Sequence, residues 1–297
     1  MSYSTHVGIS DIIFLDTPNC HAADHPSSTH SRPDVVAIDH LNLLNNAAAK
    51  LQAKSRIHWP FIEMAMEFHS SGHSFDDCLR QAQGYAAYLL AARPDLNSTL
   101  GLLVEKDCMI ILICASSGTK MVKVKKSDCP TVLAAIVKYL NNGQLNVRAS
   151  HIIKTVSPDG RATFTLNSGG GTFMDCTLGT GGYPFGCRTN IFITKEMSGD
   201  SLVRLIKEQW IRSTLRWTEK EILDTIHQSG TYPGVVRAKF FHQHLASTGQ
   251  YKTRIGLLDT GTNFMDIETP RKVIYALYDF LEGESCHLPP STRALNH

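Results

Sequence analysis

The feature that most restricts the fold of this chain is a capped helix between two strand-like runs. The segment SFDDCLRQAQGYAAYLLAARPD begins at Ser74, a good N-cap residue, has acidic residues in its first turn and stops at Pro94. Before it, residues 59–69 (WPFIEMAMEFH) alternate apolar and polar side chains, which predicts a half-buried strand. After it, residues 100–118 (LGLLVEKDCMIILICASSG) predict two strands joined by a turn at 105–107. This order of elements requires a layered domain of helices and strands.

Two further elements complete the first domain. Residues 33–39 (PDVVAID) predict another strand, and residues 129–143 (CPTVLAAIVKYLNNG) predict a second helix that ends at Asn-Asn-Gly. We therefore expect a three-layer α/β domain over 34–150. The segment before it, 1–33, is expected to be mobile, because it is rich in Pro, Ser, Thr and His from residue 17 onward.

The composition changes after about Gly143. Residues 156–190 are rich in Gly and Thr and contain strand-like pieces, and the next helix pattern is RWTEKEILDTIHQSG at 216–230. We therefore expect a second domain over 151–297, formed by a small antiparallel sheet with at least one helix. The predicted fold class of the whole chain is α+β or α/β.

Composition and charge exclude several classes of protein. The formal net charge of +2 argues against a protein whose main work is to coat nucleic acid or an anionic membrane. The amino-terminal apolar run has no Lys or Arg before it, and the apolar stretches fall short of the roughly 20 residues of a membrane span. We expect a cytoplasmic or nuclear protein outside the membrane. The eight cysteines form no CxxC pair, so reduced thiols are favoured over disulfides.

Two carboxylates form the first candidate site. Asp34 begins one predicted strand and Glu67 lies near the end of the next, so both can converge on one divalent metal ion that activates water at a phosphate. On the following helix, Gln81 and Tyr85 share one face. This pattern resembles restriction-endonuclease-like folds, which have a lysine where this chain has His69. We favour a retained fold without nuclease chemistry, and metal binding by Asp34 and Glu67 stays open.

The second candidate site combines a glycine-rich turn, a lysine and a glutamate. In LGTGGYPFGCRTNIFIT (178–194), Gly179 and Gly181 match the start of the kinase loop that covers phosphates. Lys207 ends a later apolar run, and Glu219 or Glu221 opens the helix that follows. In protein kinases a strand lysine contacts ATP and is held by a helix glutamate. The ordinary alternative is a hairpin turn, a strand-end lysine and a solvated first turn of helix.

Almost the whole chain resembles the fungal-type protein kinase family. The resemblance covers the 75–96 helix, the strands with ASSGTKM, the turn Gly186-Cys187-Arg188-Thr189, and the pieces KEQW, TEKEIL, YPGVV and RKVIYALYDFLEGE. That family joins a nuclease-like region to a protein-kinase domain, so the resemblance implies a kinase-like N-lobe as the second domain. The nucleotide-binding residues that it implies are Gly179, Gly181, Gly186, Thr189, Lys207 and Glu219, with Glu221 as the alternative partner of the lysine.

The 297 residues contain neither His-Arg-Asp nor Asp-Phe-Gly. We therefore expect the chain to stop before the kinase catalytic loop, without a C-lobe, and to be a pseudokinase that binds ATP and Mg²⁺ weakly or not at all. Its expected role is binding or regulation, with the apolar face of a predicted helix over Arg271–Leu281 as the surface for a protein partner. The alternative function is a metal-dependent nuclease or nucleic-acid-binding module in the first domain. The lysines of MVKVKK (121–126) could contact phosphate, but their alternation favours a solvated edge strand.

Overall fold

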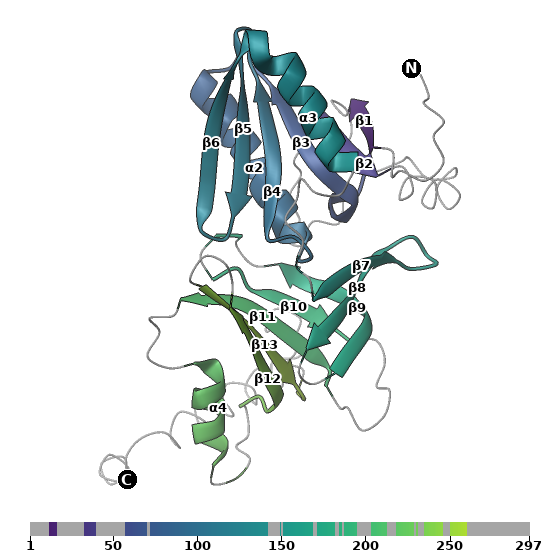
Figure 1. The fold of residues 1–297 in the computed structure, drawn as a ribbon. Helices are drawn as coiled ribbons and strands as arrows, with labels where there is room; N and C mark the ends of the chain where they lie inside the picture. The colour runs from purple at the N-terminus through teal and green to yellow at the C-terminus, as the bar shows by residue number, and fades with distance from the viewer. Residues whose placement is uncertain are drawn as a thin grey trace, which may run out of the picture.

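The computed structural model shows a mixed fold with two β-sheets that follow one another along the chain (Figure 1). It describes residues 12–16, 33–39, 57–69, 72–141, 149, 151–168, 171–181, 184–185, 187–194, 203–212, 218–228, 230, 235–245 and 250–259. The six strands of the first sheet lie within residues 12–125, and the seven strands of the second lie within residues 152–257. The predicted domain boundary falls between the two sheets.

The strands of the first sheet lie in the order in which they occur in the sequence. They are β1 (Ile12–Asp16), β2 (Val35–Asp39), β3 (Ile62–Phe68), β4 (Ser98–Val104), β5 (Cys108–Ala115) and β6 (Gly118–Lys125). Neighbours are antiparallel except β3 and β4, which are parallel because the helix α2 (Phe75–Ala92) crosses between them. One edge of the sheet therefore holds the start of β2, the ends of β3 and β4 and the start of α2. The end of α2 lies toward the opposite edge.

Two helices cover opposite faces of the first sheet and give the expected three layers. On one face, Tyr85 and Leu89 of α2 pack against Val36 and other apolar residues of β2 and β3. On the other face, α3 (Cys129–Asn141) packs its Ile136 into a cluster that contains Met64. Short 3-10 helices, η1 (Trp59–Phe61) and η2 (Lys126–Asp128), precede β3 and α3. Figure 1 shows α2 behind the sheet and α3 in front of it.

Helix α2 has the start and end that its sequence predicts. The Ser74 hydroxyl accepts a hydrogen bond from Asp77 N at 3.1 Å, which satisfies one of the free N–H groups of the first turn. The helix ends at Ala92, two residues before Pro94. A glycine on β4 brings the helix close to the sheet, since a Cβ at Gly101 would lie only 3.1 Å from the Cβ of Ala86.

The first domain differs from the expectation in two ways. Ile12–Asp16, expected to be mobile, is a strand that pairs with β2, because its apolar side chains pack against both core clusters. β3 is buried on both faces and not half-buried, since helices cover both faces of the sheet, and only its last residue, Phe68, is exposed. The rest of the expected mobile segment, residues 1–11 and 17–32, lies outside the described residues. The predicted helix over Arg271–Leu281 lies outside them as well.

The second sheet has the order β12-β13-β11-β10-β9-β8-β7, and all its neighbours are antiparallel. Its strands are β7 (Ile152–Val156), β8 (Ala162–Ser168), β9 (Gly171–Gly181), β10 (Asn190–Ile193), β11 (Leu205–Arg212), β12 (Ala238–Leu245) and β13 (Gln250–Leu257). The helix α4 (Glu219–His227) connects β11 to β12. This is the antiparallel sheet with a helix that the sequence predicts.

The second sheet curls so that strands far apart in its order meet. Phe173 of β9 stacks on Phe240 of β12 with their ring centroids 5.4 Å apart, although three strands separate β9 from β12. The apolar core of the curled sheet includes Phe164, Phe192 and Ile206, which are at most 1% exposed. This curvature gives the sheet a buried inner face and an outer face that carries α4.

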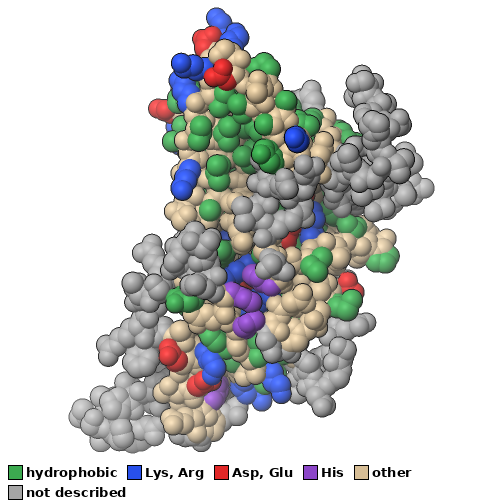
Figure 2. Space-filling model, in the orientation of Figure 1, with side chains coloured by type: hydrophobic (Ala, Val, Ile, Leu, Met, Phe, Trp, Pro, Cys, Tyr) green, Lys and Arg blue, Asp and Glu red, His purple; other side chains and the backbone are tan. Residues whose placement is uncertain are grey.

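Apolar side chains and histidines gather on different parts of the surface. Figure 2 shows apolar side chains over the first domain and histidines over the second. Exposed apolar residues of the first domain include Ile113, Met121, Val122 and Tyr139. In the part of the chain that is described, no helix is long and apolar enough to cross a membrane, and Cys78, Cys108, Cys114, Cys129, Cys176 and Cys187 are free thiols.

Candidate functional site

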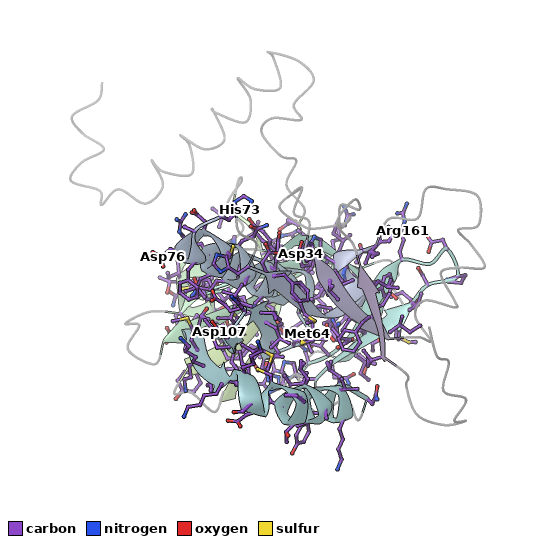
Figure 3. All side chains as sticks on the ribbon, turned by 90° about the horizontal axis from the view of Figure 1, so that it is seen from above. Asp34, Met64, His73, Asp76, Asp107 and Arg161 are labelled. Atoms are coloured by element: carbon purple, nitrogen blue, oxygen red, sulfur yellow. The ribbon has the colours of Figure 1, made fainter. Side chains whose placement is uncertain are left out.

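The structure brings Asp34 and Glu67 together at one edge of the first sheet. Val35 of β2 pairs with Met66 of β3, so the residues just outside this pair, Asp34 and Glu67, lie on neighbouring positions. Asp34 Oδ2 accepts a hydrogen bond from Phe68 N at 2.9 Å. Figure 3 shows Asp34 near the middle of the view, between Asp76 on the left and Arg161 on the right.

Glu67 is buried without full compensation of its carboxylate. Glu67 is only 6% exposed to solvent, and its Oε2 atom has no hydrogen-bond partner. Burial, and secondly the negative charge of Asp34, raise the pKa of Glu67 to about 7. A carboxyl group with such a pKa holds a proton over part of the neutral range and can exchange that proton for a cation.

His69 has contacts that turn it away from the carboxylate pair. Its Nδ1 lies 3.1 Å from Glu105 Oε1, and its Nε2 lies 2.9 Å from the carbonyl oxygen of His73. Both ring nitrogens of His69 thus lie within hydrogen-bond distance of protein oxygens, those of Glu105 and His73, and these contacts of the ring do not include Asp34 or Glu67.

The other residues of the first predicted site lie in separate pairs. Gln81 donates from Nε2 to the Tyr85 hydroxyl at 2.5 Å, as the shared helix face predicts. Glu63, which the alternation of β3 places on the face of Glu67, instead accepts a hydrogen bond from Arg93 at 2.8 Å. Among the described residues, no group of three or more His, Cys, Asp or Glu side chains is arranged to hold a metal ion. Metal binding here would thus depend on Asp34 and Glu67 alone.

The second predicted site is built around one ion pair on the outer face of the curled sheet. Lys207 Nζ on β11 lies 2.6 Å from Glu219 Oε2 at the start of α4. Gln209, two residues along the same strand, donates to the same carboxylate oxygen at 3.4 Å. About a quarter of each side chain in the ion pair is exposed, 25% for Lys207 and 26% for Glu219. The lysine therefore keeps donors that can reach a ligand in solvent.

The structure distinguishes between the two glutamates that sequence reasoning left open. Glu221 completes a capping box, because its side chain accepts from Thr218 N while Glu221 N donates to the Thr218 hydroxyl. This cap starts α4 at Glu219 and leaves Glu219 to face Lys207. Glu219 is thus the partner of the lysine, and Glu221 stabilises the helix.

The predicted glycine-rich turn lies between β9 and β10, next to the strand of the lysine. Gly181 ends β9 and pairs with Asn190 at the start of β10, and Thr189 precedes that strand. Gly179 has a packing reason, because a Cβ there would lie 3.0 Å from the Ile193 side chain. Gly186 lies outside the described residues. Gly179 and Gly181 therefore lie within β9 and not in the turn, and Gly179 serves the contact between β9 and β10.

Sequence reasoning missed a buried ionic centre on the inner face of the same sheet. Glu208, the neighbour of Lys207, is fully buried and contacts Lys252 at 2.9 Å and Arg254 at 2.6 Å. Burial opposes its charge, but Lys252 and Arg254 hold the pKa of Glu208 well below its usual value. The alternation of β11 could have placed Glu208 inside, opposite to Lys207. No pattern in the sequence indicates its partners on a strand more than 40 residues later.

A second set of buried ions joins the two domains. Arg93, just after α2, pairs with Glu63 and with Asp95, both at 2.8 Å. Lys154 of β7 reaches across to the carbonyl oxygen of Pro60 at 2.9 Å and lies 3.6 Å from Glu63. Lys154 of the second sheet therefore contacts the first domain at Pro60 and Glu63, beside the buried ion pairs of Arg93.

No family model, curated protein or solved structure matches the chain.

Proposed function

We propose that the second domain binds the phosphates of a nucleotide as a kinase-like N-lobe, and that these residues do so without phosphoryl transfer. The observation that carries the proposal is the 2.6 Å ion pair between Lys207 and Glu219. In protein kinases, a strand lysine contacts the phosphates of ATP and must be paired with a helix glutamate.

The order of the elements supports the same proposal. Two antiparallel strands, β9 and β10, are joined by the glycine-rich turn, the next strand carries Lys207, and the following helix carries Glu219. A partly exposed lysine beside such a turn presents positive charge and N–H donors to a phosphate group. This combination fits a nucleotide better than it fits an ordinary hairpin, because a surface lysine gains little from an ion pair alone.

The chemistry that the described residues can supply is limited to binding. The 297 residues have no His-Arg-Asp or Asp-Phe-Gly triplet, and the described residues have no cluster that could hold Mg²⁺. Lys207 would neutralise phosphate charge, and Glu219 would orient the lysine. The function that follows is weak nucleotide binding in a regulatory or scaffolding role, as in a pseudokinase of the fungal type that the sequence resembles.

Nucleotide binding is tested by titrating the chain with ATP in a calorimeter, with and without Mg²⁺. We expect Lys207→Met to weaken binding at least tenfold, because it removes the phosphate-facing charge, and Glu219→Gln to weaken it less. Lys239→Met, which changes an exposed lysine on β12 of the same sheet, is the matched control and should bind as the wild type does. Absence of binding by the wild type, or binding that Lys207→Met leaves unchanged, contradicts the proposal.

A divalent metal ion at Asp34 and Glu67 is the second candidate, and it would belong to a metal-dependent nuclease. The buried, unpartnered Oε2 atom of Glu67 beside Asp34 favours it. The engagement of His69 with Glu105 opposes it, since it occupies the residue that stands where restriction-endonuclease-like folds have their lysine. We therefore expect the chain to leave DNA intact.

The nuclease candidate is tested by incubating plasmid DNA with the chain and Mn²⁺. Cleavage by the wild type that Asp34→Ala abolishes would establish the nuclease and overturn our expectation. Asp107→Asn changes an exposed acid in the turn between β4 and β5 and is the control, since it lies outside the carboxylate pair. Intact plasmid with every variant agrees with a fold that lacks nuclease chemistry.

A further inference from the structure

Arg188 links the second sheet to the end of helix α2 in the first domain. The residue is 1% exposed, and its guanidinium donates to the carbonyl oxygens of Leu90 at 2.5 Å, Arg93 at 2.8 Å and Leu96 at 2.6 Å. The last carbonyl groups of a helix have no partner within the helix and carry its partial negative charge. Arg188 therefore caps α2 from the other domain, and it is held there by three hydrogen bonds.

The backbone around Arg188 is tied to the strand that carries Lys207. Arg188 lies two residues before β10, and the carbonyl oxygen of its neighbour Cys187 accepts a hydrogen bond from Trp210 N on β11 at 2.8 Å. β10 in turn pairs Ile191 with Lys207. The end of α2 is thus connected to Lys207 through the Arg188 side chain, the backbone of residues 187–191 and the pairing of β10 with β11.

The backbone at Arg188 adopts a conformation that needs support from its surroundings. Its φ angle is +20°, within a region that residues other than glycine rarely adopt. Such a conformation persists only where the surroundings hold it in place. Here the three carbonyl groups of the first domain hold the guanidinium, and Cys187 is held by β11.

Arg188 cannot itself be part of the nucleotide-binding face. The pairing of Asn190 with Glu208 places both on the inner face of the sheet, and Lys207 lies on the outer face. The guanidinium contacts carbonyl oxygens of the first domain, and only 1% of the Arg188 residue is exposed to solvent. Any effect of Arg188 on a nucleotide must therefore pass through β10 and β11.

We propose that Arg188 is a positioning residue, through which the end of α2 fixes the turn-side end of β10 and thereby the geometry of Lys207. This inference rests on the proposed nucleotide binding and adds its regulation: the first domain sets the affinity of the second. Because coupling between two sites is reciprocal, a bound nucleotide must also tighten the contact between Arg188 and α2. Both directions can be measured.

The first experiment compares ATP affinity among arginine variants by calorimetry. We expect Arg188→Met to weaken ATP binding at least fivefold and Arg188→Lys to recover part of the loss, since a lysine can still donate to one or two of the carbonyl groups. Arg161→Met is the matched control, because Arg161 is an exposed arginine near the turn between β7 and β8. Arg188→Met that is folded by circular dichroism and binds ATP as tightly as the wild type overturns the inference.

The second experiment uses the wild type alone and does not depend on a variant that folds. Hydrogen exchange is measured with and without ATP at the amides of the last turn of α2, of residue 93 and of residues 95–97. We expect ATP to slow exchange there at least threefold, although these amides lie in the other domain. Unchanged exchange at saturating ATP overturns the inference.

The outcomes separate this inference from the proposed function. A wild type that binds no ATP overturns both. Binding that Lys207→Met abolishes and Arg188→Met leaves intact overturns the role of Arg188 alone and keeps the nucleotide site.

Discussion

At the scale of single residues, Glu67 holds a proton at pH values where an exposed glutamate has lost it. Its pKa rises from 4.5 to about 7, mainly through burial and then through Asp34. The folded state thus binds this proton more tightly than the unfolded state, so the free energy of unfolding falls as pH rises from about 4.5 to above 7. The stabilising contribution is complete below pH 4.5 and is lost through pH 7.

The substitution Glu67→Gln isolates this contribution. A glutamine resembles the protonated acid at every pH, so we expect the variant to exceed the wild type in stability at pH 8.5 by on the order of 2 kcal/mol, and to match it near pH 5. Urea unfolding at both pH values measures the difference. Asp76→Asn, at an exposed acid of the first turn of α2, is the control. An equal difference between Glu67→Gln and the wild type at both pH values would show that the carboxyl group does not titrate as described.

At the scale of elements, two glycines should respond to the same substitution with opposite signs. A Cβ at Gly256 of β13 would lie 2.1 Å from the ring of Phe240, which stacks on Phe173, whereas a Cβ at Gly84 of α2 would meet no atom nearer than 3.9 Å. The ring of Phe240 lies over Gly256 because Gly256 lacks a side chain. No close contact requires a glycine at position 84, and glycine there makes the helix less stable than alanine would.

We expect Gly256→Ala to destabilise the chain by about 1–3 kcal/mol, because the ring of Phe240 must leave its place. Gly84→Ala should stabilise it by roughly 0.5–1 kcal/mol, because alanine is the better helix former. Urea unfolding of both variants beside the wild type checks the two signs. A neutral Gly256→Ala would mean that the ring of Phe240 can move aside at no cost.

The elements also show what could be predicted from the sequence. Helix α2 was predictable to within a residue, because its cap, its apolar spacing and its proline are all local signals. β1 was not, because the run Ile12–Asp16 becomes a strand only through pairing with β2 and packing on the core. Lys207 and Glu219 were named in advance, but the choice of Glu219 over Glu221 depended on which of them the capping box used.

At the scale of the whole molecule, the two sheets are held together by side chains that gave no signal in the sequence. Arg188 and Lys154 resemble ordinary surface cations until the fold brings their partners in the first domain to them. Local patterns report which residues turn inward on one element, and they do not report which distant carbonyl or carboxylate will be found there. The domain contents were therefore predictable, and the way in which the domains are joined was not.

The curled second sheet has a consequence for the order in which the chain can fold. The first sheet and its helices are complete once Asn141 has been made, and each of its strands pairs with the strands next to it in the sequence. In the second sheet, Arg254 of β13 donates to the carbonyl oxygens of Asn167 and His151, which lie 87 and 103 residues earlier. During synthesis the inner face of β7 and β8 therefore stays uncovered until β13 has been made. We therefore expect the first domain to fold before the second domain folds and packs against it.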